Sequence, residues 1–359
     1  MISPVYFSVL SAVIAFGWLA ESDSRSYTRP DGTLWDKPNR TAATSLTCIL
    51  IFVAGFRYSV GTDFPAYYTW PKYSWFGVFT TIVTFQEGGF HFLATLSKTI
   101  WSSGQSVIFF SSLVTVGLYC RTIYRYSSMY FLSMLLYLFM GEWQGSFNAV
   151  RQYVAAAIVF SGHRLILEQN IRKYLGVIFL AALFHKSAIV MCLPYFILTR
   201  KPSHGQIVLL ALGAIVLRFS YAQVFDVVGE LKGTEMNVEG DEYLSNDVNT
   251  FRILVAFIPV AVYLLQCRKT GHTKEQDFYI NALIFNAFTM LAAAGSCYLA
   301  RIGAYTNATS IIGYGSLFSL IDDEKNRKTT MFGLLAMYLI YWYHSVRILR
   351  NGTFEFGFG

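Results

Sequence analysis

Apolar runs recur along the whole chain, and short polar clusters separate them. A helix needs about 20 mainly apolar residues to cross a bilayer, and most of the runs approach that length. They lie near residues 3–20, 43–60, 106–124, 128–141, 149–167, 172–185, 187–199, 206–222, 250–267, 277–298, 302–321 and 330–347. The pattern predicts an all-α, polytopic integral membrane protein with about twelve transmembrane helices, within a range of about 10–14.

Two of these runs decide on which side of the membrane the later loops lie. Residues 172–185 and 187–199 are each too short to cross a bilayer as one straight helix. They form either one long broken helix or two short ones. The sequence leaves open whether residues 172–199 cross once or twice.

Composition points to a bilayer as the surrounding solvent. Of the 359 residues, 54% are hydrophobic and only 14% are charged, whereas a soluble domain carries about 25% charged residues. A single soluble core would leave many of these apolar side chains in water. The first run, Met1–Ala20, has no basic stretch before it and no good cleavage site after it. We therefore interpret it as the first span and not as a signal peptide.

The positive charges indicate the orientation of the chain. The formal net charge is +7, and more than half of the lysines and arginines fall in clusters on alternate loops, provided that residues 172–199 cross twice. Such loops face the cytoplasm, so both termini are expected outside. Because the charge is spread over short loops, we expect no nucleic-acid partner. The clusters are Arg25/Arg29/Lys37/Arg40, Arg121/Arg125, Arg164/Arg172/Lys173, Arg200/Lys201, Arg268/Lys269/Lys274 and Lys325/Arg327/Lys328.

Two outer segments are expected within a single polytopic domain that covers residues 1–359. Residues 64–105 form an outer loop, and its amphipathic stretch HFLATLSKTIW is predicted to be an interfacial helix. Residues 223–249 form an acidic outer loop, which is either solvated or a lid over a site. Its carboxylates fix no ligand geometry, and the five cysteines contain no CxxC pair. We therefore expect neither a metal nor another cofactor.

Cationic and imidazole side chains gather at the outer helix ends. A charge near the bilayer centre costs roughly 2.5–3.5 kcal/mol, so the group implies a shared anionic ligand or a network of carboxylates. Guanidinium groups match phosphate oxygens in a bidentate way. The cationic and imidazole residues are Arg57, Arg151, His185, Lys186 and Arg301, and the carboxylates in reach are Asp63, Glu87 and Glu142.

Structural roles remain open for the same residues. Arg57 and Lys186 can snorkel from the helix ends to the interface. Arg151 can form a structural bridge to Glu142. Asp63 follows a glycine and a threonine, and it can serve as a turn former.

Five short motifs follow one another along the chain: FRYSVGTDFPAYY, EGGFHFL, NAVRQYVAAAI, LFHKSAIV and ARIGAY. In this order and spacing they resemble the EpsG-like branch of Wzy-type polysaccharide polymerases, over residues 45–310. The resemblance implies a multi-pass glycosyltransferase of the bacterial inner membrane. It would join oligosaccharide repeat units carried on undecaprenyl pyrophosphate at the periplasmic face, with one lipid-linked chain as donor and another as acceptor. A membrane protein that regulates chain length is a further partner to consider.

The residue types suit this chemistry. Breaking a glycosyl–phosphate bond leaves an oxocarbenium-like sugar and a more anionic diphosphate, which arginines can stabilise. We expect Arg151 and Arg301 to form the pyrophosphate clamp, with Arg57 as a third contact. His185 is a candidate base or diphosphate donor, and Asp63 is the competing base. The other expected substrate contacts are Thr62, Tyr67, Tyr68, Glu87, Glu142, Gln152, Lys186 and Tyr305.

Two other functions use the same features. A transporter or flippase for an anionic lipid-linked sugar would need the cationic cavity without chemistry, although the two halves of the chain show no internal repeat. A membrane acyltransferase that modifies polysaccharide would use His185 as its base. Neither the sugars nor the linkage can be read from the sequence.

Overall fold

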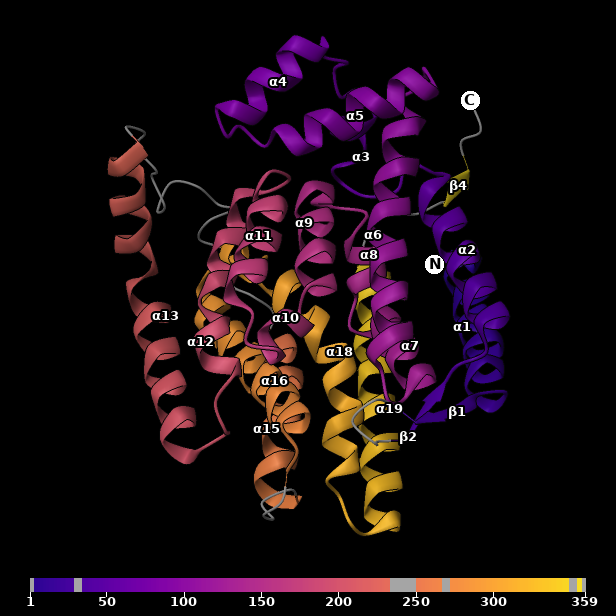
Figure 1. Cartoon of the computed structure of the whole chain (residues 1–359), viewed down its shortest axis with the longest axis vertical. Helices are drawn as coiled ribbons and strands as arrows, with labels where there is room; N and C mark the ends of the chain where they lie inside the picture. Colours follow the sequence, from indigo (N-terminus) through magenta and orange to yellow (C-terminus); the bar gives the residue numbers. More distant parts are fainter. Residues whose placement is uncertain (1–2, 29–33, 233–249, 267–271, 349–353, 357–359) are drawn as a thin grey trace. The chain divides into compact units, whose positions relative to one another are not determined.

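Helices make up nearly all the regular structure in a computed structural model of the chain, as Figure 1 shows. It describes residues 3–28, 34–232, 250–266, 272–348 and 354–356. The chain divides into two compact units. Unit 1 comprises Met1–Tyr195 with Tyr338–Gly359, and unit 2 comprises Phe196–Met337. The all-α expectation is confirmed, since the strands among the described residues are short and few.

Unit 1 is a bundle in which α2 packs against α1 and α6, and α9 packs against α6 and α11. Side-chain caps fix where several helices begin: the Ser3 hydroxyl accepts from the Val5 amide at 3.4 Å, and the Asn39 side chain accepts from the Ala42 amide at 3.0 Å. The helices are α1 (Pro4–Ser22), α2 (Arg40–Gly55), α3 (Phe64–Tyr68), α4 (Trp75–Val83), α5 (Gly88–Ile100), α6 (Gln105–Tyr126), α7 (Tyr130–Phe139), α8 (Glu142–Gly145), α9 (Val150–Ser161), α10 (Arg164–Leu167), α11 (Ile171–Ala182) and the 3₁₀ helix η1 (Lys186–Cys192).

Two small antiparallel sheets in unit 1 were not predicted from the sequence. Strands β1 (Arg25–Thr28) and β2 (Leu34–Lys37) form a hairpin after α1. Strand β3 (Arg57–Tyr58) pairs with β4 (Glu355–Phe356) near the end of the chain. Segments of two to four residues are too short to show the alternation by which strands are recognised.

Residues 172–195 form two legs that run in opposite directions. Helix α11 and η1 pack against each other. The Tyr174 hydroxyl, near the start of α11, donates to the Met191 carbonyl at 2.8 Å, and its ring stacks on Tyr195 at 5.8 Å. The start of the first leg therefore lies beside the end of the second. The segment therefore doubles back on itself, and its second leg is 3₁₀ and not a continuous α-helix. That the two legs cross the membrane twice stays a prediction.

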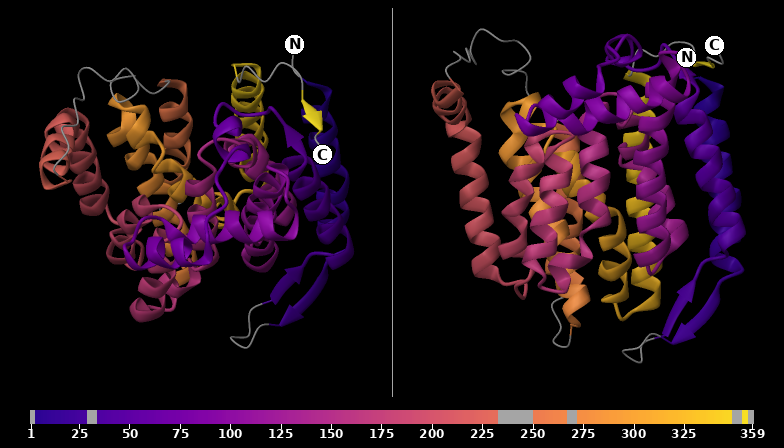
Figure 2. Two further views of the ribbon diagram at one scale, coloured as in Figure 1. Left: turned by 90° about the horizontal axis from the view of Figure 1, so that it is seen from above. Right: turned by 45° about the horizontal axis from the view of Figure 1, so that its top comes forward.

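Helices α4 and α5 lie across one end of α6, α9 and α11, as both views in Figure 2 and Figure 1 show. Helix α5 occupies the stretch for which a short amphipathic helix was predicted. The turn between α4 and α5 is tight, because a Cβ at Gly88 would overlap the backbone of Ile82. Glycine at this position therefore allows α5 to fold back on α4.

Unit 2 contains α13 (His204–Lys232), α15 (Thr250–Gln266), α16 (Lys274–Ala292), the 3₁₀ turn η2 (Ala293–Gly295), α17 (Cys297–Ala300) and α18 (Gly303–Ser319). Helix α16 packs against α13, α15 and α18. A capping box between Thr273 and Gln276 begins α16. Helix α12 (Pro194–Leu198) and helix α19 (Glu324–Ile348) each contribute residues to both units.

Every predicted span contains a helical segment, but the count of twelve crossings is not confirmed. Among the described residues, two helices are long and apolar enough to span a membrane: Pro4–Ser22 and Gln105–Tyr126. Breaks in the helices explain part of the shortfall, and α16 and α19 are long enough but do not meet the hydropathy and charge requirements. The predicted span 149–167, for example, divides into α9 and α10. Of the acidic segment 223–249, the first part is helical in α13, and residues 233–249 lie outside the described residues.

The two ends of unit 1 differ in chemistry, and α6 connects them. At its first turn, the Gln105 amide donates to the carbonyls of Gly55 and Arg57 at 2.7 and 3.0 Å. At its last turn, Tyr124 lies beside the ammonium of Lys37. Helix α6 has 22 residues, a length of roughly 33 Å, which is close to the thickness of a bilayer core. We refer below to the Arg57 end and the Lys37 end of unit 1.

Candidate functional site

An ion pair between Glu87 and Arg151 lies at the centre of the Arg57 end. Arg151 stands in the first turn of α9, and its Nη1 pairs with Oε2 of Glu87, which immediately precedes α5. The other oxygen of Glu87, Oε1, accepts from the backbone amide of Lys186 at 3.2 Å. One carboxylate therefore joins the starts of α5, α9 and η1, three segments that are far apart in the sequence.

The Arg151 guanidinium retains donors for a ligand. Its side chain is 34% exposed, and its plane lies over the Trp70 ring, with Cζ 5.3 Å from the ring centre. Arg151 Nε is buried and has no hydrogen-bond partner among the described residues, so it is not offered to an outside ligand. A guanidinium carries five N–H donors, and the pair with Glu87 through Nη1 leaves the Nη2 donors for an anion.

Two aromatic residues and one histidine that the sequence analysis did not single out complete this cluster. The His91 ring lies between Tyr73 and Trp70, with ring centres 4.4 and 5.4 Å away. Burial lowers the pKa of His91 below its ordinary value, the Arg151 charge lowers the pKa further, and the Glu87 charge opposes both. His91 follows Glu87 by four residues on α5, so its helical spacing was a signal that would have found it.

His185 is held as a helix cap. Its Nδ1 accepts from the Ser187 backbone amide at 3.3 Å and lies 2.7 Å from the Ser187 hydroxyl. Because Nδ1 is the acceptor, the proton of the neutral ring is on Nε2. Lys186 is exposed, and only its backbone amide contacts Glu87. The contact from the Lys186 amide places this turn beside the Glu87–Arg151 pair, although the three segments are far apart in the sequence.

Asp63 fastens the loop before α3 to the start of α9. Its Oδ2 accepts from the Ala149 amide at 2.8 Å. The Asn148 side-chain oxygen accepts from the Thr62 hydroxyl at 3.1 Å and from the Asp63 amide at 3.4 Å. Because Ala149 precedes Arg151 by two residues, this contact places Asp63 close to the start of α9. Asn148 was not predicted, and polarity alone gave no signal for it.

Strained backbone occurs on both sides of this site. Glu87 and Ala149 have φ values of 55° and 47°, which are left-handed conformations, and each immediately precedes a helix. Such conformations in non-glycine residues cost about 1–3 kcal/mol and cluster at functional sites. The two residues set the entry directions of α5 and α9, and hence the place where Glu87 and Arg151 meet.

Arg57 is enclosed by protein and does not line the surface. The side chain is 1% exposed. Its Nη1 donates to the Ala54 carbonyl and to the Ser112 hydroxyl, the latter at 3.0 Å, and Nη2 donates to the Phe147 carbonyl at 3.5 Å. Its Cζ lies 4.6 Å from the centre of the Phe147 ring. In this arrangement Arg57 ties α2, α6 and the loop after α8 together.

Glu142 lies apart from Arg151. It is buried, and its Oε2 accepts from the Tyr119 hydroxyl at 3.2 Å. The alternative of a structural bridge between Arg151 and Glu142 is therefore wrong, because Glu87 occupies that position. Gln152 is buried as well.

The two tyrosines after Asp63 pack within unit 1. Tyr67 is buried and stacks on Trp70 with ring centres 5.9 Å apart. Tyr68 is half-buried and stacks on Phe64 at 5.3 Å. Both belong to an apolar cluster with Phe90. In this conformation their rings support the loop, and a sugar contact by them stays a prediction.

Arg301 and Tyr305 belong to unit 2. Arg301 is half-buried just before α18, and Tyr305 is buried within that helix. Arg252, which the sequence analysis did not single out, approaches the same turn, with its Nη2 3.5 Å from the Ala300 carbonyl. A Cβ at Gly303 would lie 2.6 Å from the Met290 methyl and 3.0 Å from that Nη2. Glycine at this position therefore leaves room for the Met290 and Arg252 side chains.

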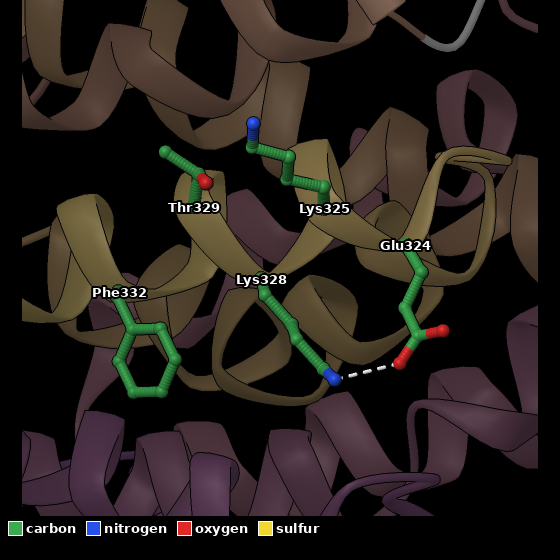
Figure 3. A pocket seen from close by; sticks show the side chains of 5 residues that line it. All are labelled: Glu324, Lys325, Lys328, Thr329 and Phe332. Carbon is green, nitrogen blue, oxygen red and sulfur yellow. Dashed lines mark ion pairs between the residues drawn. The ribbon is translucent and has the colours of Figure 1, made fainter.

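A hollow of about 490 Å³ opens on α19 in unit 2 and is drawn in Figure 3. Lys328 pairs with Glu324 one turn away at 2.6 Å, and Lys325 points away from that pair. The residues that line it are mostly exposed and come from one helix. The hollow brings together none of the predicted site residues.

Comparison with known proteins gives one positive result. The model of a family described as EpsG family matches residues 41–356, which include every predicted site residue. Searches among curated proteins and among solved structures gave no significant match.

Proposed function

The chain belongs to the EpsG family, a family of polymerase-like membrane proteins of polysaccharide biosynthesis, and on that premise we propose that it joins lipid-linked oligosaccharide repeat units. The donor is a repeat unit on undecaprenyl pyrophosphate, and the acceptor is a sugar hydroxyl of a second lipid-linked unit. The observation that carries the proposal is the partly exposed Arg151 guanidinium, fixed by Glu87 and Trp70 with donors to spare.

The proposed step is a glycosyl transfer. The acceptor oxygen forms a bond to the anomeric carbon, and the bond from that carbon to the diphosphate oxygen breaks. The hydroxyl proton passes to a base, and the lipid diphosphate leaves. Negative charge grows on the departing diphosphate, where Arg151 donors stabilise it. The Nε2–H of His185 supplies a further donor, and the Asp63 carboxylate is positioned beside α9 to receive the proton.

The site is proposed to face the periplasm. Within unit 1, the Arg57 end and the basic Lys37 end lie at opposite ends of α6. Because basic loops favour the cytoplasmic side, the Arg57 end is then on the opposite side of the inner membrane. Arg301 of unit 2 remains a proposed second clamp residue, and its role rests on the family motif alone.

Purified full-length protein in detergent tests the proposal directly. We expect it to elongate lipid-linked repeat units without another enzyme and with a chelator present, because no metal is invoked in the step. A ladder of products on a gel is the readout. Absence of product from folded protein that still moves the lipid across vesicles would identify a transporter instead. Loss of product in chelator, restored by a divalent ion, would assign a metal, with the acidic residues 233–249 as the first place to look.

The replacement His185→Gln distinguishes a donor from a base. Glutamine keeps an N–H donor but cannot take a proton, so we expect partial activity, with a similar rate from about pH 5.5 to 8. A base must be neutral to accept a proton, and an ordinary histidine titrates near ~6.5. Two results together would therefore make His185 the base. The wild-type rate would fall as the pH is lowered through this range, and His185→Gln would have almost no activity at any pH. Asp63→Asn is expected to be the more damaging change of the two.

A further inference from the structure

A cavity at the Lys37 end of unit 1 is rich in positive charge. It has a volume of about 300 Å³ and opens where α1 ends, where α2 begins and beside the last turn of α6. Three cations, Arg25, Lys37 and Arg40, line it against one carboxylate, Asp23. The Asn39 side-chain amide already donates to Asp23, so this carboxylate is engaged by a neutral group.

The cations of this cavity are not neutralised by any of the described residues. Within the described part of the chain, no carboxylate lies within ion-pair distance of Arg25, Lys37 or Arg40. The Lys37 ammonium stands between two aromatic rings, 5.8 Å from the centres of both Tyr27 and Tyr124. Contacts with ring faces hold a cation in place without cancelling its charge.

Tyr124 contributes its ring to the lining of the cavity, beside the Lys37 ammonium. Its hydroxyl is buried, without a hydrogen-bond partner among the described residues, and is not offered to a ligand in the cavity. The lining therefore offers guanidinium and ammonium donors, which are the groups that bind phosphate oxygens.

The level of the cavity along α1 and α6 indicates that its phosphate belongs to a lipid head group. The helices α1 and α6, whose length and hydropathy suit a membrane span, both end at its edge, at Ser22 and Tyr126. The hydrocarbon region ends where such helices end, and lipid phosphates lie at that level. Basic pockets on the cytoplasmic side of membrane helices bind anionic lipid head groups.

We propose that this cavity, lined by Arg25, Lys37, Arg40 and Tyr124, binds the phosphate of an anionic phospholipid of the cytoplasmic leaflet. The site is at the opposite end of unit 1 from the Glu87–Arg151 pair, and it does not depend on the proposed glycosyl transfer. An occupant there would fix the hairpin β1–β2 and the first turn of α2 to the membrane surface.

Native mass spectrometry of the full-length protein with added phosphatidylglycerol tests the site. We expect Lys37→Gln and Arg40→Gln each to weaken binding about fivefold, since a basic residue near a membrane surface contributes roughly that factor. Tyr124→Phe keeps the ring beside Lys37 and removes only a buried hydroxyl, so unchanged binding is expected. Phosphatidylcholine should bind equally weakly to all variants, and their melting temperatures in that lipid should match the wild type.

The matched control is Arg121→Gln. Arg121 is an exposed cation on α6 one turn before Tyr124, but it does not line the cavity. If Arg121→Gln weakens binding as much as the cavity variants do, general surface charge explains the effect and the site is overturned. Unchanged binding in Lys37→Gln and Arg40→Gln would overturn it as well. Displacement of the lipid by millimolar inorganic phosphate at constant ionic strength would assign the cavity to soluble phosphate instead of lipid.

Discussion

Replacement of Arg151 by lysine is expected to reduce polymer formation on the order of a hundred- to thousandfold while protein levels stay near normal. Lysine keeps the charge but loses the planar fork that contacts Glu87 and Trp70 and that, in the proposed step, also contacts a diphosphate. A donor lost from a group that gains charge in the transition state costs about 2.7–4 kcal/mol. Elongation rates of purified wild-type and variant protein at saturating lipid-linked substrate measure the effect.

Arg164→Lys is the matched control for this change. Arg164 is also half-buried and also lies over an aromatic ring, with Cζ 5.3 Å from the centre of Tyr126, but it follows α9 at its other end. The same chemical change there should leave polymer formation unaltered. Full activity in Arg151→Lys would return Arg151 to a purely structural role and would remove the observation on which the proposed function rests.

Replacement of Arg57 by methionine is expected to destabilise the protein by roughly 3 kcal/mol. Methionine fills much of the volume but leaves the Phe147 carbonyl and the Ser112 hydroxyl without their donor. A buried polar group that loses its partner costs about 1–3 kcal/mol, and the stacking on Phe147 is lost too. The removal of a buried charge offsets part of this cost. A lower melting temperature in detergent and a lower protein level in membranes would show this loss of stability.

The controls for Arg57 separate stability from ligand binding. Arg121→Met, at an exposed position on α6, should leave the melting temperature unchanged. If Arg57→Met keeps its melting temperature and level but abolishes polymer formation, then Arg57 contacts the substrate, as its place in the motif suggested. Loss of both together would agree with its enclosure between α2, α6 and the loop before α9.

The two arginines illustrate what sequence reasoning can and cannot assign. Arg57 and Arg151 both stand at helix ends beside motifs with aromatic residues, so similar roles were predicted for both from the sequence. Their environments differ because Arg57, just after α2, packs against the Phe147 ring, whereas Arg151, in the first turn of α9, is partly exposed. Burial depends on which segments pack around a residue, and that information is spread over the whole chain.

Long-range pairing was the other feature hidden from the sequence. Glu142 was the nearer carboxylate to Arg151 along the chain, but Glu87, which is 64 residues away, forms the pair. The reason is geometric: left-handed conformations at Glu87 and Ala149 set how α5 and α9 begin, where the side chains of Glu87 and Arg151 meet. Conformations of this kind in non-glycine residues carry no clear sequence signal, so Trp70 and Asn148 also joined the site unpredicted, whereas the helical spacing of His91 from Glu87 was a signal that could have been used.

By itself, the sequence determined the properties that depend on local composition. Apolar runs gave the helices, basic loops gave a proposed orientation, and short motifs in order gave the family, which the match over residues 41–356 confirms. Only the tertiary structure decided that residues 172–195 double back, that Arg57 is enclosed and that Glu87 joins Arg151 to the backbone of Lys186. These outcomes depend on contacts between distant segments, whose free energies are settled only when the helices pack.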